Sequence, residues 1–205
     1  MPFFFLKVGP MRRAEARTDP TSGVLNYPRQ SIRYWLVKPF LSLASTLQGG
    51  RFFVNFLTPV DRWLLQRSSG RWSIAGLGAP TLLLTTLGRR SGTKRSTPLL
   101  YLPDPNDPTT LYVIASKGGA PELPDWYLNL RQERRAEILS RSMSGHVIAI
   151  VLEGPSRDWI WEAFVRFNSG FATYAARNKR EIPVVALTLD NLADTLIYNP
   201  SAEGD

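Results

Sequence analysis

A short basic loop between two apolar runs holds the residue types best suited to chemistry. Four of the seven residues in Arg89–Arg95 are cationic, Gly88 and Gly92 bracket the loop, and residues 62–103 contain no acidic side chain. Glycine adopts positive φ and so lets backbone N–H groups face an anion, while arginine binds phosphate or carboxylate through paired hydrogen bonds. The pattern predicts an anion-binding loop, with a solvated, charged hairpin turn as the simpler alternative.

A second device for anions lies further along the chain. Ser116, Lys117, Gly118 and Gly119 directly follow an apolar run, so the glycines allow close approach of a ligand and the lysine adds a point charge. The spacing matches neither a Walker A loop nor GxGxxG, which argues against a P-loop and a Rossmann site. Two such devices suit an anionic, planar cofactor. Pro98, between them, is expected to end strand hydrogen bonding and to present a flat face to a ring.

Composition limits the function classes. The chain has 205 residues, 43% of them hydrophobic, and a net charge of +8, which together suit one domain with an N-terminal extension and anionic partners. It contains no cysteine and one histidine, so we expect no disulfide and no thiolate or histidine metal site. No window reaches the ~18 apolar residues of a membrane span. We predict a cytoplasmic protein, with peripheral membrane association left open.

The N-terminal part is expected to form an arm and helices. Residues 1–30 read as loop, apolar spacing predicts a helix over 31–47, and Thr58 followed by proline predicts the start of a helix that ends at Arg67. These helices either pack on the domain or at a homodimer interface, or contact a membrane surface through arginine and aromatic side chains. The predicted division is 1–70 for the arm and helices, 71–190 for the main domain and 191–205 for a tail.

Turn residues between β-branched and aromatic runs predict a largely antiparallel sheet. The predicted strands are residues 81–87, 96–102, 110–115, 137–143, 146–153 and 182–189. Hairpins with helices inserted between them favour an α+β fold or a small barrel over a doubly wound parallel sheet.

The elements between these strands are also predictable. Helices are expected to begin near Asp125, near residue 156 and near residue 171. The second of them has an apolar stripe, which includes Trp159, Phe164 and Phe167 and is predicted to pack in the core. Ser144 and Gly145 are the predicted turn of the fourth and fifth strands, which would leave His146 exposed in a turn.

Three strings of residues resemble one known family. LLLTTLGRRSGTKRSTPLLYL, VIASKGGAPELPDWYLNL and FATYAARNKREIPVVAL, in this order, are similar to the deazaflavin-dependent nitroreductase family, and the resemblance covers roughly Thr81 to Leu189. Its members are split β-barrel oxidoreductases that use coenzyme F-420, an 8-hydroxy-5-deazaflavin. The resemblance implies an α+β, FMN-binding-like split β-barrel with an N-terminal helical extension. It also implies this cofactor, with FMN as the alternative.

The resemblance also implies site residues. In the basic loop the phosphate and oligoglutamate tail would be held by Arg89, Arg90, Ser91, Arg95, Ser96 and Thr97. Further cofactor contacts would come from Pro98, Ile114, Ala115, Ser116, Lys117, Asp125, Trp126, Tyr127, Asn129 and Phe171. Phe167 and Phe171 occupy positions where the family often has tyrosine, so Ser116 and Tyr174 are the remaining candidate catalytic proton donors.

These observations lead to one leading hypothesis. The protein would pass a hydride from the reduced deazaflavin to an apolar, planar acceptor such as a quinone, an enone or a nitroaromatic, while the chain supplies binding, orientation and water exclusion. The alternative is a non-catalytic split-barrel protein that holds a flavin, lipid or tetrapyrrole. No nucleic-acid partner is expected, because the aromatic residues that stack bases are not interleaved on a basic face.

Overall fold

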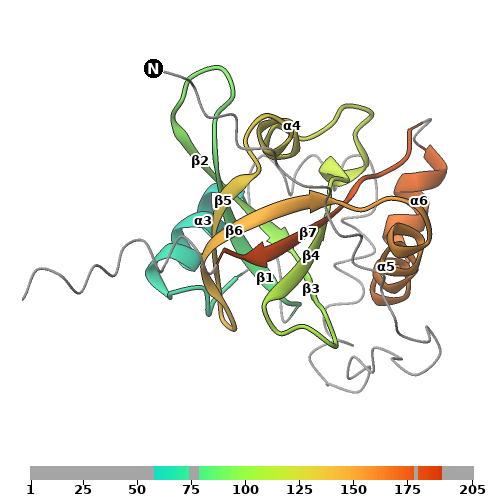
Figure 1. Ribbon diagram of the computed structural model, residues 1–205, viewed down its shortest axis with the longest axis horizontal. Helices are drawn as coiled ribbons and strands as arrows, with labels where there is room; N and C mark the ends of the chain where they lie inside the picture. Colours follow the sequence, from blue (N-terminus) through green and yellow to red (C-terminus); the bar gives the residue numbers. More distant parts are fainter. Residues whose placement is uncertain (1–57, 74–78, 178–179, 191–205) are drawn as a thin grey trace, which may run out of the picture.

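The computed structural model describes residues 58–73, 79–177 and 180–190, which form one curled sheet with helices packed against it (Figure 1). In chain order the elements are α3 (Thr58–Arg67), β1 (Thr81–Leu87), β2 (Lys94–Leu100), β3 (Leu102–Pro103), β4 (Thr110–Ile114), the 3-10 helix η2 (Lys117–Gly119), α4 (Asp125–Gln132), β5 (Arg135–Ser140), β6 (Ser144–Val151), α5 (Gly154–Phe167), α6 (Gly170–Arg177) and β7 (Val184–Leu189). The predicted arm at 1–30, helix at 31–47 and tail at 191–205 lie outside the described residues.

The seven strands pair in the order β2-β1-β5-β6-β7-β4-β3, and every neighbouring pair is antiparallel. The last of the described strands, β7, therefore lies inside the sheet, where it joins β6 to β4. Helix α3 precedes β1, α4 lies between β4 and β5, and α5 and α6 lie between β6 and β7. This arrangement confirms the predicted α+β split barrel and excludes a doubly wound parallel sheet for the described residues.

The two faces of the sheet form two separate apolar cores. Val113 of β4 faces the inside of the curl and packs with α4, whereas its neighbour Ile114 faces outward, because successive strand residues point to opposite faces. Helices α5 and α6 cover this outer core (Figure 1). Phe164 is fully buried there, with Trp159 and Phe167 packed around it, so the core role predicted for this helical stripe is confirmed.

Helix α3 is described from Thr58 to Arg67 and is anchored on the sheet. It lies against β1, β2 and β5, and its Leu65 is fully buried. The buried carboxylate of Asp61 accepts a hydrogen bond of 2.9 Å from the Ser73 hydroxyl. Trp63, by contrast, keeps 57% of its surface exposed. None of the described helices is both long enough and apolar enough to cross a lipid bilayer.

The strand predicted over 96–102 is two strands. β2 ends at Leu100, and β3 begins at Leu102 because the chain leaves β1 there and pairs with β4 instead. Tyr101 lies at the change of partner, and its N–H still donates to Pro80 O at 3.1 Å. The prediction was therefore right about extended backbone but wrong about its continuity.

The turn between β5 and β6 comes earlier than predicted. Ser140 closes it, because its hydroxyl donates to Met143 O at 2.8 Å and accepts from the Met143 N–H at 2.9 Å. The two residues predicted as the turn thus belong to β6. His146 is a strand residue opposite Glu137, not a turn residue, and its Nε2 lies 3.8 Å from the Glu137 carboxylate.

Candidate functional site

The loop between β1 and β2 is a tight turn with a closed backbone. Gly88 N–H donates to Thr93 O at 2.9 Å, and Gly92 N–H donates to Gly88 O at 2.8 Å. Gly92 has a φ of 65°, which a residue with a side chain adopts only at an energetic cost. The turn therefore presents the two arginines between its glycines from a fixed backbone.

Helix α4 fixes the first of these arginines. Asn129 accepts hydrogen bonds from the Arg89 backbone N–H at 3.1 Å and from its guanidinium at 3.2 Å, and donates to Thr86 Oγ1 at 3.0 Å. Asp125 accepts a further bond of 2.9 Å from the Arg89 guanidinium. Asn129 is buried, so losing its three side-chain hydrogen bonds would leave polar groups unsatisfied and would be costly. The turn and the helix thus form one rigid unit.

A pocket of about 400 Å³ opens beside this unit. Its lining residues are Arg62, Thr86, Gly88, Arg89, Arg90, Ser91, Arg95, Ser96, Thr97, Asp125, Trp126 and Asn129. Asp125, the one carboxylate among them, is already paired with Arg89. The remaining lining groups are hydroxyls, an amide, an indole and three further arginines, a set of donors suited to an anion.

The three further arginines have no acidic partner among the residues that the structure describes. They come from different elements: Arg62 from α3, Arg90 from the turn and Arg95 from β2. The neighbouring Lys94 behaves differently, since it pairs with Glu137 at 2.6 Å and does not line the pocket. Strand alternation separates the two adjacent cations and leaves Arg95 to the pocket.

Pro98 does not end strand pairing, as its residue type had suggested. It lies within β2, opposite Leu83 of β1. The bond from Gly88 to Thr93 marks a hydrogen-bonded pair, and every second pair along this ladder has the same type, so Pro98 occupies a non-hydrogen-bonded position. Its missing N–H faces the open edge of the sheet and interrupts nothing.

The second predicted device is a turn whose backbone forms an anion-binding shape. Ser116 is right-handed, with φ −80° and ψ −27°, and Lys117, Gly118 and Gly119 follow with φ values of 50°, 61° and 82°. This order forms a nest, in which consecutive N–H groups point into one concavity. Ser116 O and Lys117 O accept from the N–H groups of Gly119 and Ala120 at 3.0 and 3.2 Å. The described residues offer no backbone acceptor to the first three N–H groups of the nest.

Two aromatic residues of α6 lie behind the nest. A Cβ on Gly119 would come within 2.6 Å of the Tyr174 ring, so only glycine fits there. Tyr174 is buried, and Phe171 packs between it and Phe164 with ring centroids 6.0 and 5.9 Å apart. Neither α6 residue lines the pocket at the β1–β2 turn.

The predicted site residues therefore divide into two sets. The pocket brings together Arg89, Arg90, Ser91, Arg95, Ser96, Thr97, Asp125, Trp126 and Asn129. The other set lies outside the pocket and consists of Pro98, Ile114, Ala115, Ser116, Lys117, Tyr127, Phe171 and Tyr174. Of this set, Ala115 and Tyr127 are buried in the inner core, and Ile114, Phe171 and Tyr174 are buried in the outer core. The segment from η2 into α4 connects the two sets along one end of the sheet (Figure 1).

Sequence reasoning did not assign Arg62, Thr86 or Arg180 to a site. Arg62 stood in the acid-free stretch, but its approach to the pocket depends on how α3 packs on the sheet. Arg180 binds backbone carbonyls next to the nest, where burial lowers the pKa of its guanidinium, opposed by the charge of Glu122. The guanidinium still carries its charge, because arginine is not deprotonated in proteins.

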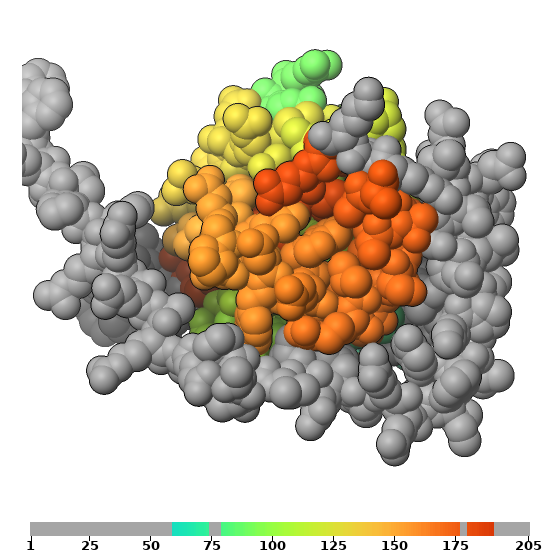
Figure 2. All heavy atoms as spheres, turned by 90° about the vertical axis from the view of Figure 1, so that its right-hand side faces the viewer, coloured from blue at the N-terminus to red at the C-terminus, as the bar shows by residue number. Residues whose placement is uncertain are grey.

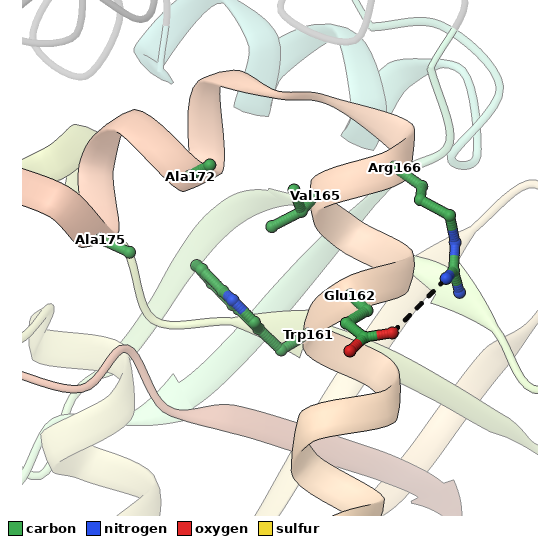
Figure 3. Close-up of a pocket in the computed structure, with 6 residues that line it drawn as sticks. All are labelled: Trp161, Glu162, Val165, Arg166, Ala172 and Ala175. Atoms are coloured by element: carbon green, nitrogen blue, oxygen red, sulfur yellow. Dashed lines mark ion pairs between the residues drawn. The ribbon is translucent and has the colours of Figure 1, made fainter.

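A second hollow, of about 390 Å³, lies on the face formed by α5 and α6, coloured orange in Figure 2. Figure 3 shows Trp161 and Val165 of α5 facing Ala172 and Ala175 of α6, with Glu162 and Arg166 paired at the rim. None of the predicted site residues lines it. The charge and the polar donors lie at the first pocket instead.

Comparison with known proteins agrees with this geometry. Residues 60–189 match the family model described as F420H(2)-dependent quinone reductase. An F420H(2)-dependent quinone reductase of Mycobacterium tuberculosis (strain ATCC 25618 / H37Rv) is 34% identical over 112 residues, which cover 53% of this chain and 73% of that protein.

Two solved structures are also similar, each with 31% identity and a TM-score of 0.48. One is titled an F420-H2 dependent reductase (FDR-A), with 53% of this chain and 93% of that chain covered. The other is titled a domain-swapped dimer, with 53% and 79% covered. The family model spans more than half of the chain and confirms the resemblance seen in its residues. The chain therefore belongs to the F420H(2)-dependent quinone reductase family, a family of oxidoreductases whose cofactor is coenzyme F-420.

Proposed function

We propose that this protein reduces quinones with reduced coenzyme F-420 and that the pocket at the β1–β2 turn holds the anionic part of the coenzyme. The family supplies the reaction class and the cofactor. The observation in this chain that supports the pocket is the meeting of Arg62, Arg90 and Arg95, none with an acidic partner among the described residues. Unpaired cations from three elements would repel one another, so an anionic ligand stabilises their arrangement.

The donor set fits a phosphate with an acidic tail. Arg90 and Arg95 are exposed and can each form a bidentate hydrogen-bond pair, while Ser96 and Thr97 offer shorter hydroxyl contacts. Arg89 is held by α4 and is suited to maintaining the turn rather than to following a mobile tail. The nest at residues 116–118 offers three N–H groups to a further polar part of the coenzyme.

Bound reduced coenzyme supplies a hydride, so the chain needs no nucleophile of its own. The roles left to the chain are to bind, to orient and to exclude water. Ser116 and Tyr174 remain the proposed proton donors. Ser116 lies at the start of the nest and is half-buried, whereas Tyr174 is buried against Gly119 and would act only on a group that reaches this position.

Two measurements test the proposal. The first titrates the protein with oxidised coenzyme F-420 and, separately, with FMN. We expect binding of the deazaflavin that is weakened by alanine at Arg95. Binding of FMN alone, with the Arg95 variant unaffected, would contradict the proposed site.

The second measurement follows the absorbance of the oxidised coenzyme as it recovers in an anaerobic mixture of protein, reduced coenzyme and a quinone. We expect recovery with a quinone, and parallel reactions with a nitroaromatic and an enone define the range of acceptors. Tight binding of the coenzyme without recovery for any acceptor would support the non-catalytic binding protein instead.

We also propose peripheral membrane contact or homodimer formation through the N-terminal helices. Among the described residues, α3 exposes Val60 and Trp63 beside Arg62 and Arg67, and Trp72 follows with 68% of its surface exposed. Aromatic and cationic side chains together suit an anionic membrane surface. Sedimentation with anionic vesicles, compared for the wild type and a Trp63→Ala/Trp72→Ala variant, tests the contact, and light scattering measures the oligomeric state.

A further inference from the structure

Arg180, which precedes β7, binds the backbone on both sides of the nest. Its Nε donates to Pro121 O at 2.8 Å, and its Nη2 donates to Glu122 O at 3.0 Å and to Ala120 O at 3.2 Å. Both terminal nitrogens also approach Ala115 O, at 3.4 and 3.5 Å. One guanidinium thus joins the residue before the nest to the three residues after it.

These contacts matter because the C=O and N–H of one peptide unit point in opposite directions. The carbonyl of Ala115 shares a peptide unit with the Ser116 N–H, so a cation on Ala115 O directs the Ser116 N–H away, toward the nest. The next two units are fixed in the same way by the bonds of Ser116 O and Lys117 O within the turn. Arg180 supplies the one anchor that the turn does not make for itself.

We propose that Arg180 is a positioning residue, which holds the N–H groups of residues 116–118 in the direction that a bound anion requires. The proposal rests on the proposed function, since it assigns this role within the coenzyme site. Arginine suits it because the planar group has five donors in a fixed fork, whereas lysine has three donors on one nitrogen. Arg180 itself points its donors at carbonyls, so it is not a contact for the coenzyme.

Arg157 of α5 provides a matched control. It binds the chain two residues after Arg180, because its Nη2 donates to Ile182 O at 3.1 Å, and only 13% of its side chain is exposed. Its hydrogen-bond and ion-pair partners among the described residues are Asp158, Glu181 and Ile182, and none of them lies in residues 115–122. A general loosening of residues 180–183 would therefore follow from either substitution, whereas misdirected N–H groups would follow from Arg180→Lys alone.

The test measures two properties of the wild type, Arg180→Lys and Arg157→Lys. The first is amide hydrogen exchange of residues 115–122 without ligand, and the second is the dissociation constant for oxidised coenzyme F-420. For Arg180→Lys we expect both exchange and dissociation constant to rise about tenfold or more, since charge-assisted hydrogen bonds are lost. For Arg157→Lys we expect both to stay within about twofold of wild type, the change expected of a residue that does not touch the nest. If Arg180→Lys does not fold, Arg180→Gln takes its place.

Two results would overturn the proposal. The first is unchanged coenzyme affinity in Arg180→Lys. The second is an equal loss of coenzyme affinity in Arg157→Lys, which would indicate general loosening. If the wild type itself does not bind the coenzyme, the proposed function fails. The hold of Arg180 on the nest is then judged by exchange alone: faster exchange confined to residues 115–122 supports it, and unchanged exchange overturns it.

Discussion

The β1–β2 turn and the η2 turn both offer donors to an anion, but they do so by opposite means. In the first, exposed arginine side chains provide the donors, and a buried asparagine fixes the backbone beneath them. In the second, backbone N–H groups provide the donors, and a half-buried arginine fixes them from behind. Arginine side chains can therefore contact an anion directly at the first turn, whereas at the second turn an arginine acts on the anion only through the backbone N–H groups.

This difference predicts different sensitivities. Flexible side chains tolerate a range of anion positions and attract over a distance that salt screens, whereas a nest accepts one geometry and depends little on salt. The first turn is thus suited to a charged and variable part of a ligand. The second is suited to a part whose position must be fixed.

The largest effect is expected from removing the two exposed arginines of the first turn together. Arg90→Ala/Arg95→Ala should weaken coenzyme binding about 100-fold or more, because each charge-assisted hydrogen bond contributes about 1.5–3 kcal/mol. Binding by the variant should also depend less on salt. The matched control is Lys94→Ala, which should change affinity by less than about twofold because exposed pairs such as Lys94–Glu137 contribute little. Equal losses in both variants would show that net charge, not the pocket, binds the coenzyme.

Replacing one glycine in each turn distinguishes the cost of an unfavourable φ from the cost of a steric clash. Gly92→Ala should lower the free energy of unfolding by about 1–2 kcal/mol, because φ is 65° but no atom lies within 4 Å of the new Cβ. Gly119→Ala meets the Tyr174 ring at 2.6 Å in addition, which should add about 1–3 kcal/mol. Urea unfolding measures both. Equal losses would mean that the Tyr174 ring moves aside freely.

Substitutions of the two partners of Arg89, Asn129 and Asp125, should differ in their cost to stability. Asn129→Ala removes a buried amide and leaves Thr86 and the Arg89 N–H without their partner, so it should cost about 1–3 kcal/mol of stability. Asp125 is 80% exposed at its side chain, and Asp125→Ala should cost below about 1 kcal/mol. A larger loss for Asp125→Ala would mean that the ion pair, not the amide, fixes the turn.

The β3–β4 loop gives a reference outside both turns, with the smallest effect on binding. Hydrogen bonds from Thr109, then from Thr110, lower the pKa of Asp107 from 3.8. Because the pKa is lowered in the folded state, the carboxylate stabilises the protein at any pH above its ordinary pKa. This contribution is lost as the pH falls through the pKa of the folded state. The wild type should therefore be more stable than Asp107→Asn at neutral pH, and this difference should disappear in strong acid. Thermal unfolding of both proteins at both pH values measures it. A change in coenzyme affinity would instead link this loop to the site.

Local signals predicted much of this molecule. Turn residues separated the strands, and the residues of β1 were predicted without error at 81–87. The basic loop and the paired glycines also identified both turns. These features depend on neighbours in the chain, so the sequence alone shows them.

What escaped prediction depends on contacts between distant residues. Nothing local signals that the Ser140 hydroxyl closes the β5–β6 turn early, or that Arg62 reaches the pocket once α3 packs on the sheet. Arg180 bonds to carbonyls 58 to 65 residues away. In a run of charged residues it resembles its neighbours, and only the folded chain shows that it is used differently.

The position of β7 has a consequence for the order in which the site can form during synthesis. This strand is the last of the described elements to leave the ribosome, yet it joins β6 to β4 in the sheet. Until it emerges, the half that contains the arginine pocket and the half that contains β4 share no strand pairing. Arg180 emerges only just ahead of β7. All residues that line the arginine pocket precede β7 in the chain and are therefore made first, whereas the proposed hold of Arg180 on the nest depends on one of the last parts of this domain to be made.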